Sequence, residues 1–171
     1  MQRRSFLTFA ACSASLALIS LSGCGFALRK APDFAFTTLY SALPASSAVG
    51  VELRRALQSS GKVKVVTDAR LINEAQVILE VLLDQREKVV LSMSTAGQVT
   101  EFRLHLRFRF RLRTPAGKEL IAPTELALQR DISYTESVTL AKEAEEALLY
   151  RDMQSDVVQQ IMRRLAAVKE L

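Results

Sequence analysis

The sequence predicts an α/β (α+β) two-layer sandwich, in which a mostly antiparallel four-stranded sheet carries two helices packed on one face. Three observations support this fold class. Residues 101–113 alternate between apolar and mostly basic side chains, which is typical of a strand with one buried face. Residues 139–168 place apolar side chains three and four positions apart, which is typical of an amphipathic helix. The segments follow the order strand, helix, strands, helix.

The first elements are predicted from strand formers and turn residues. Residues 33–40 are rich in Phe and Thr and predict a strand. Ser47 can cap a helix, and Gly61 can end it. The apolar side chains of this helix fall at helical spacing: Val49, Leu53, Ala56 and Leu57. Residues 62–66 are consistent with a further short strand.

Residues 75–93 predict a long strand or a strand with a bulge. The alternation places Val77, Leu79, Val81 and Leu83 on one face, loses phase near Gln85 and Glu87, and resumes at Val89. Residues 94–97 supply a hairpin loop.

The next strand, over residues 101–113, extends about 40 Å at roughly 3.3 Å per residue. Its apolar side chains lie on one face and its basic side chains on the other. A turn at residues 114–117 leads to a last strand over 125–134, in which Arg130 interrupts an apolar row. The final helix begins near Ser137 or Thr139 and ends near Val168. Its apolar line comprises Leu140, Ala144, Ala147, Tyr150, Met153, Val157, Ile161, Leu165 and Val168.

The N-terminus has the features of an export signal. Arg3 and Arg4 precede an apolar run, and the residues before Cys24 are small. The segment 21–24 resembles the lipobox of bacterial lipoproteins, which implies cleavage after residue 23 and acylation of Cys24, for example by palmitate. An ordinary signal peptide or an uncleaved anchor is the alternative. The predicted organisation is a signal peptide at 1–23, a lipidated tether at 24–32 and one domain at 33–171.

The export route stays open. Residues 3–7 resemble a twin-arginine motif, and a general secretory signal also begins with basic residues. Gly25 stands where inner-membrane lipoproteins commonly carry Asp, which favours the outer membrane by analogy. Loss of Arg3 and Arg4 with the signal would lower the formal charge from +5 to +3. Cys12 would leave as well, so no internal disulfide is expected.

The composition argues against catalysis. The chain has one histidine, His105, no Cys and His cluster at metal-ligand spacing, and no phosphate-binding or dinucleotide-binding glycine motif. We therefore predict a protein that is not an enzyme and holds no metal or cofactor. Nucleic acid is not an expected partner, because the phenylalanines of 101–113 face away from the arginines, whereas RNA-binding sheets keep aromatic and basic side chains together.

Both ends of the predicted mature chain resemble the LptE family of LPS-assembly lipoproteins. Residues 25–29 (GFALR) follow the lipobox as in that family, and the segments 139–143 and 153–165 are similar to its last helix. The resemblance implies a one-to-one complex with the outer-membrane β-barrel LptD, in which the protein plugs the lumen, assists barrel assembly and binds lipopolysaccharide during its transport. Ser94 and Thr95 replace a basic position of the family's hairpin.

The candidate binding residues are basic side chains of the strand and its flanking turns, whose guanidinium groups suit phosphate or carboxylate. They are Arg103, Arg107, Arg109, Arg111, Arg113, Lys118 and Arg130. The alternative is a solvated face with cross-strand partners such as Glu80 and Asp84. Arg130 indicates a bulge, a snorkelling side chain or a buried contact to the partner. A general periplasmic binding or chaperone-like lipoprotein is the second functional hypothesis.

Overall fold

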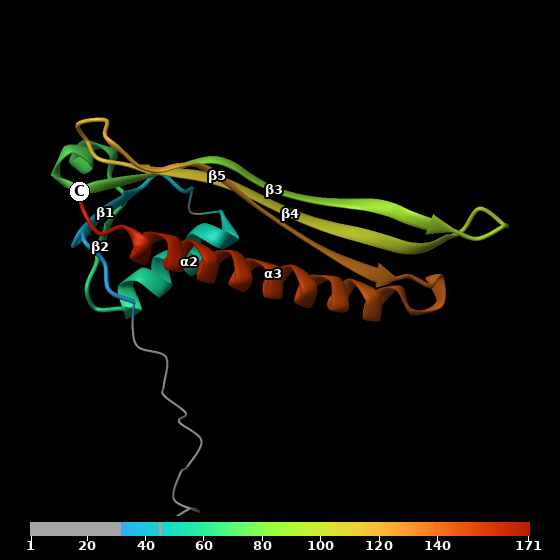
Figure 1. The fold of residues 1–171 in the computed structure, drawn as a ribbon. Coiled ribbons are helices and arrows are strands. Elements are labelled where there is room, and N and C mark those ends of the chain that lie inside the picture. The colour runs from blue at the N-terminus through green and yellow to red at the C-terminus, as the bar shows by residue number, and fades with distance from the viewer. Residues whose placement is uncertain (1–31, 45) are drawn as a thin grey trace, which may run out of the picture. The chain divides into compact units, whose positions relative to one another are not determined.

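The computed structural model of the chain describes residues 32–44 and 46–171. The predicted signal peptide, Cys24 and most of the tether lie outside this part. Figure 1 shows a sheet layer and a helical layer, which residues Pro32–Leu171 form as one compact unit. The elements in chain order are β1 (Thr38–Ser41), α2 (Ala48–Ser59), β2 (Lys64–Val66), η1 (Ala69–Glu74), β3 (Val77–Met93), β4 (Val99–Arg113), β5 (Glu119–Ser133), η2 (Glu136–Val138) and α3 (Thr139–Ala167).

The sheet has five strands in the order β2-β1-β3-β4-β5 and is mixed. β1 runs parallel to both β2 and β3, whereas β3, β4 and β5 form an antiparallel meander. The predicted four-stranded sheet is therefore wrong in strand number. Residues 64–66 form a fifth strand, and α2 is the crossover that returns the chain parallel to β1. The first strand is also shorter than predicted, although Phe36 before it is buried.

Both helices lie on the same side of the sheet, as predicted (Figure 1). Ser47 caps α2, because its Oγ accepts a hydrogen bond of 2.9 Å from the backbone N–H of Gly50. The apolar residues of β4 meet those of α2 and α3 in one continuous core. Its largest fully buried side chains include Phe36, Phe108, Phe110, Leu53, Leu79, Met153 and Ile161.

The loss of phase in β3 has a physical cause. The register with β4 shifts between Val81 and Leu83, so Leu82 forms a β-bulge. The extra residue moves each following side chain of β3 to the opposite face of the sheet, up to the next register shift. Leu83 therefore pairs with Arg109 on the outer face, and the prediction that Leu83 shares a face with Leu79 is wrong. Asp84 instead pairs with Phe108, on the side of the helices.

The start of α3 also differs from the prediction. Leu140 is 82% exposed, and Ala144 and Ala147 are exposed too, so the buried line begins at Tyr150. After the bulge, β3 turns charged side chains toward this part of α3, and Lys88 forms an ion pair with Glu146. The first turns of α3 thus lie over a polar region of the sheet.

Candidate binding face

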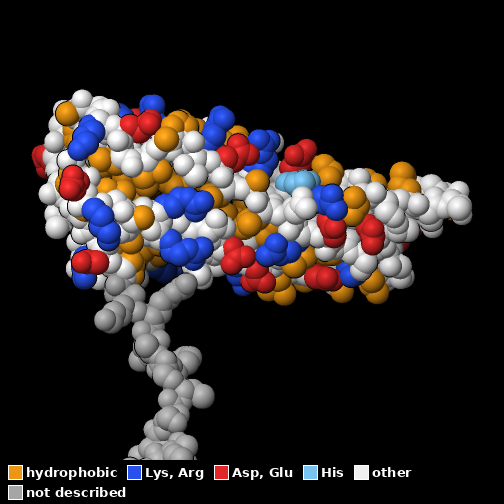
Figure 2. Space-filling model, in the orientation of Figure 1, with side chains coloured by type: hydrophobic (Ala, Val, Ile, Leu, Met, Phe, Trp, Pro, Cys, Tyr) orange, Lys and Arg blue, Asp and Glu red, His pale blue; other side chains and the backbone are white. Residues whose placement is uncertain are grey.

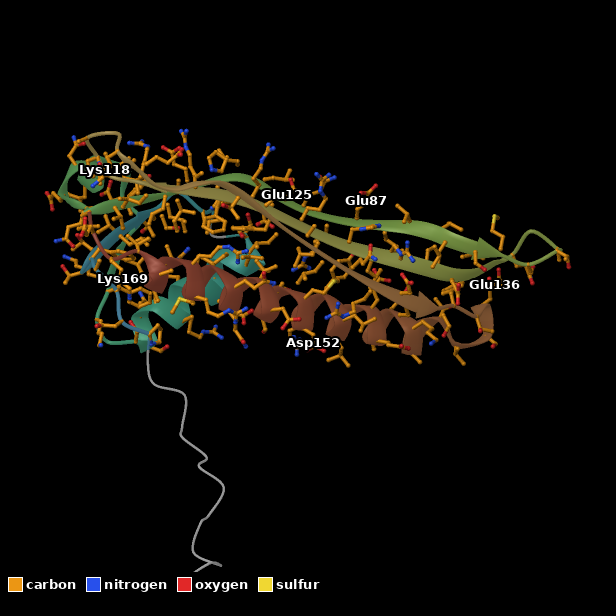
Figure 3. All side chains as sticks on the ribbon, in the orientation of Figure 1. Glu87, Lys118, Glu125, Glu136, Asp152 and Lys169 are labelled. Atoms are coloured by element: carbon orange, nitrogen blue, oxygen red, sulfur yellow. The ribbon has the colours of Figure 1, made fainter. Side chains whose placement is uncertain are left out.

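The arginines of β4 lie on the sheet face opposite the helices. Directly paired residues of neighbouring strands share a face, so the register assigns Gln85 and Glu87 of β3 to this side. Figure 3 shows Glu87 and Glu125 on the side of the sheet away from α2 and α3. We call this surface the arginine face. Its five arginines are Arg103, Arg107, Arg109, Arg111 and Arg113, which confirms the predicted alternation.

Two of these arginines bind carboxylates of β5. Arg103 donates from Nε to Oδ1 of Asp131 at 2.7 Å, and Arg107 donates from Nε to Oε1 of Glu125 at 2.9 Å. Along the upper edge in Figure 2, basic and acidic side chains accordingly alternate. Neither carboxylate was predicted as a partner from the sequence. Glu125 and Asp131 are an even number of residues apart along one strand, which places them on the same face. This spacing could have predicted that both carboxylates face the arginines.

Two further arginines converge on one carboxylate. Glu80 accepts from Nε of Arg111 at 2.5 Å and from Nε of Arg113 at 2.6 Å. The expected cross-strand role of Glu80 is therefore confirmed. The expected role of Asp84 is wrong, because the bulge turns Asp84 toward α2, where it accepts a hydrogen bond of 2.6 Å from Ser47 Oγ.

The ion pairs change the acidity of their carboxyl groups. Burial acts to raise the pKa of Glu80, but the hydrogen bonds from Arg113 and Arg111 outweigh it and hold this pKa below its ordinary value of 4.5. The hydrogen bond from Arg103 lowers the pKa of Asp131. These carboxylates therefore stabilise the folded state while they are ionised.

Glu80→Gln is expected to lower the free energy of unfolding at pH 7 by about 1–3 kcal/mol, because two charged hydrogen bonds weaken at a partly buried site. The depressed pKa of Glu80 stabilises the fold above the ordinary value of 4.5 and ceases to do so as the pH falls through the folded-state pKa. The difference from the wild type should therefore shrink on acidification. Urea unfolding of both proteins at several pH values measures this difference in unfolding free energy. The exposed Glu119→Gln is the control, and an equal effect there contradicts the prediction.

Arg109 differs from the other four arginines. Like Arg107 it is exposed, but unlike the other four it makes no hydrogen bond or ion pair within the described ranges 32–44 and 46–171. Its cross-strand neighbours are Leu83 and Glu125, and Glu125 is already bound by Arg107. Arg109 is thus the arginine of this face that is available to an external anion without breaking an existing pair.

The remaining candidates are engaged within the domain. Lys118 donates from Nζ to the terminal Leu171 O at 2.9 Å. Arg130 lies on the helix side of β5 in regular register with Leu104, so the bulge interpretation is wrong. Its exposed guanidinium reaches Oδ2 of Asp156 on α3 at 3.3 Å. Within the domain its stem crosses the helix side of the sheet and its charged end stays exposed, as in a snorkelling arginine, and the buried contact to the partner stays a prediction.

The part of the chain that the structure describes holds no group of three or more His, Cys, Asp or Glu side chains placed to bind a metal ion. None of its helices is both long and apolar enough to cross a membrane. The β3–β4 hairpin carries no charge at residues 89–100, and its end in Figure 2 shows no acidic or basic side chain. The hairpin therefore offers no cation in place of the family's basic position.

The fold and the arginine face define a class of protein: a two-layer α+β domain with an apolar core on one side of its sheet and an ion-paired polar surface on the other. The chain belongs to the LptE (lipopolysaccharide-assembly) family, whose model matches residues 36–165.

Solved structures agree with this membership. The chain is 36% identical to uncharacterized lipoprotein B from Nitrosomonas europaea, with a TM-score of 0.70 over 84% of this chain and 92% of that one. A minor lipoprotein from Acinetobacter baumannii shares the fold at 24% identity and a TM-score of 0.61, over 79% of this chain and 94% of that one. The rare lipoprotein B from Shewanella oneidensis also shares the fold, at 24% identity and a TM-score of 0.61, over 77% of this chain and 93% of that one.

Proposed function

We propose that this LPS-assembly protein plugs the lumen of the LptD β-barrel, assists its assembly and binds lipopolysaccharide during transport to the outer leaflet. The observation that carries the proposal is the arginine face. Outer-membrane barrels have polar interiors. A domain whose broad sheet surface is polar and pairs four of its five arginines internally can occupy such a lumen if the barrel or its cargo supplies one anion for Arg109. The role requires no catalysis, metal or cofactor.

Membership in this family also supports a lipid anchor. We assign the anchor to Cys24, which would carry the acyl chains and hold the domain at the periplasmic side of the outer membrane. Each buried CH₂ group contributes about 0.8 kcal/mol, and stable attachment takes more than one chain or a second signal.

A detergent-extracted pull-down with tagged protein tests the plug role. The expected result is one large β-barrel at equal stoichiometry that stays bound through high salt. Recovery of several soluble clients, without a barrel, contradicts the proposal and favours the chaperone-like alternative. Lipopolysaccharide recovered with the purified complex supports the second half of the proposal.

Arg109→Glu is expected to weaken binding of lipopolysaccharide or of the barrel about tenfold, because a charged hydrogen bond is lost and a like charge replaces it. Titration of each partner against the purified variant measures the loss and identifies the ligand of Arg109. Lys64→Glu, at the exposed position of β2, is the control and makes the same charge change elsewhere on the sheet. If both variants bind like the wild type, the arginine face is a solvated surface.

A further inference from the structure

A charged trough runs along the helical layer, away from the arginine face. It consists of two adjoining hollows. The first, of about 720 Å³, is lined among others by Ala48, Val51, Glu52, Arg55, Ala56 and Arg151. The second, of about 650 Å³, is lined among others by Arg86, Lys88, Glu143, Glu146, Tyr150 and Arg151. The two hollows are adjacent, because Ala48, Arg151 and Gln154 line both.

Three elements each contribute one arginine to this trough: Arg55 from α2, Arg151 from α3 and Arg86 from β3. None of the three makes a hydrogen bond or ion pair with residues 32–44 or 46–171. Arg86 lies over the ring of Tyr150, 5.2 Å from its centroid, which leaves its N–H groups free. Unpaired guanidinium groups retain their full capacity to bind carboxylates.

The carboxylates of the trough are largely engaged. Glu52 accepts from Ser155 Oγ at 2.7 Å, which joins α2 to α3. Glu146 binds Lys88 Nζ at 2.6 Å. Glu143 also lines the second hollow and makes no hydrogen bond or ion pair among the described residues, so the three free arginines of the trough face one free carboxylate. The stretch from Arg55 to Arg151 therefore presents two free cations and one carboxylate that is already hydrogen-bonded.

Apolar side chains lie between these cations. Ala48 and Ala56 line the first hollow, and Val51 there is 40% exposed. The combined trough is larger than a single small anion requires, and its cations are distributed over three elements rather than gathered around one point. This pattern fits an extended ligand that alternates carboxylates with apolar groups.

We propose that the trough binds an acidic segment of a partner polypeptide. Its carboxylates would pair with Arg55, Arg151 and Arg86, and its apolar side chains would contact Val51 and the neighbouring alanines. The inference rests on charge complementarity in the trough and is independent of the arginine face. It therefore stands or fails separately from the proposed plug role.

Fluorescence anisotropy with the purified full chain tests this inference. The probe is the rhodamine-labelled peptide LEELLEEL, and a peptide with lysine in place of glutamate is its matched control. Arg151→Glu is expected to weaken binding of the acidic peptide at least tenfold, because Arg151 lines both hollows. Arg55→Glu should weaken it at least threefold, and added salt should weaken it further. Arg163→Glu, an equal change at an exposed position of α3 outside the trough, should leave it within twofold.

A photo-crosslinking amino acid at Val51 gives a second readout that does not depend on charge reversal. It is expected to join the chain to the acidic peptide and not to the basic one. Equal weakening by Arg163→Glu would show a general charge effect and overturn the inference. Complete competition by inorganic phosphate at matched concentration, or by delipidated lipopolysaccharide oligosaccharide, would also overturn it, because the ligand would then be a phosphate. If the acidic peptide does not bind at low salt, the inference is overturned as well.

Discussion

Replacing Phe108 by alanine is expected to lower the free energy of unfolding by about 3–5 kcal/mol. The side chain is fully buried in the middle of β4, and its ring lies 6.1 Å from that of Phe110. Its cross-strand neighbour on β5, Leu126, is buried as well. Removal of the ring leaves a cavity between the sheet and the helices that close packing prevents from collapsing completely.

Urea unfolding followed by circular dichroism measures this loss. Leu140→Ala is the matched control, because Leu140 is 82% exposed and its truncation removes little buried surface. That variant should differ from the wild type by less than about 0.5 kcal/mol. A loss of under about 1 kcal/mol for Phe108→Ala would contradict the packing of β4 against the helical layer.

In cells that lack the barrel, Cys24→Ser is expected to move the protein from the membrane fraction to the soluble fraction. The substitution removes the proposed attachment site of the acyl chains, and no helix within residues 32–44 and 46–171 offers a membrane span. Fractionation of cells after a carbonate wash measures the change, and mass spectrometry of the mature N-terminus identifies the acyl groups.

Cys12→Ser is the control for this experiment, because Cys12 lies in the predicted signal segment and should be removed with it. That variant should remain membrane-bound and acylated. If Cys24→Ser stays in the washed membrane fraction when the barrel is absent, the anchor lies elsewhere. If it stays only when the barrel is present, the plug complex holds the protein independently of its lipid.

Period-two patterns in the sequence predicted the meander well where they were unbroken. The alternation over residues 101–113 correctly assigned both faces of β4. The loss of phase near Gln85 and Glu87 correctly indicated a bulge. The alternation still placed Leu83 on the wrong face, because the extra residue, Leu82, is itself apolar and lies before the visible loss of phase. The helical spacing also predicted that Leu140 is buried, but it is exposed. Periodicity identifies one face of a helix, but it does not show how far the sheet under that face remains apolar.

The candidate site was predictable only in part. The row of arginines on β4 could be predicted from the sequence. Which arginine is paired and which is free could not, because it depends on whether Arg107 or Arg109 reaches Glu125 on the neighbouring strand β5. The pairing of Glu80 with two arginines likewise requires the three-dimensional register. Arg55 and Arg151 were not singled out, because the trough arises from the packing of α2 against α3, which local sequence does not specify.

Some strand pairs of the sheet join segments that are adjacent in the sequence, and others join segments that are far apart in it. β3, β4 and β5 pair through two tight hairpins, so their contacts form with little loss of chain entropy. β1 must instead find β3 across α2, β2 and η1, because Leu39 pairs with Val77. Contacts between distant residues slow folding. We therefore expect the meander to form first and to serve as the template on which the β1–α2–β2 segment docks.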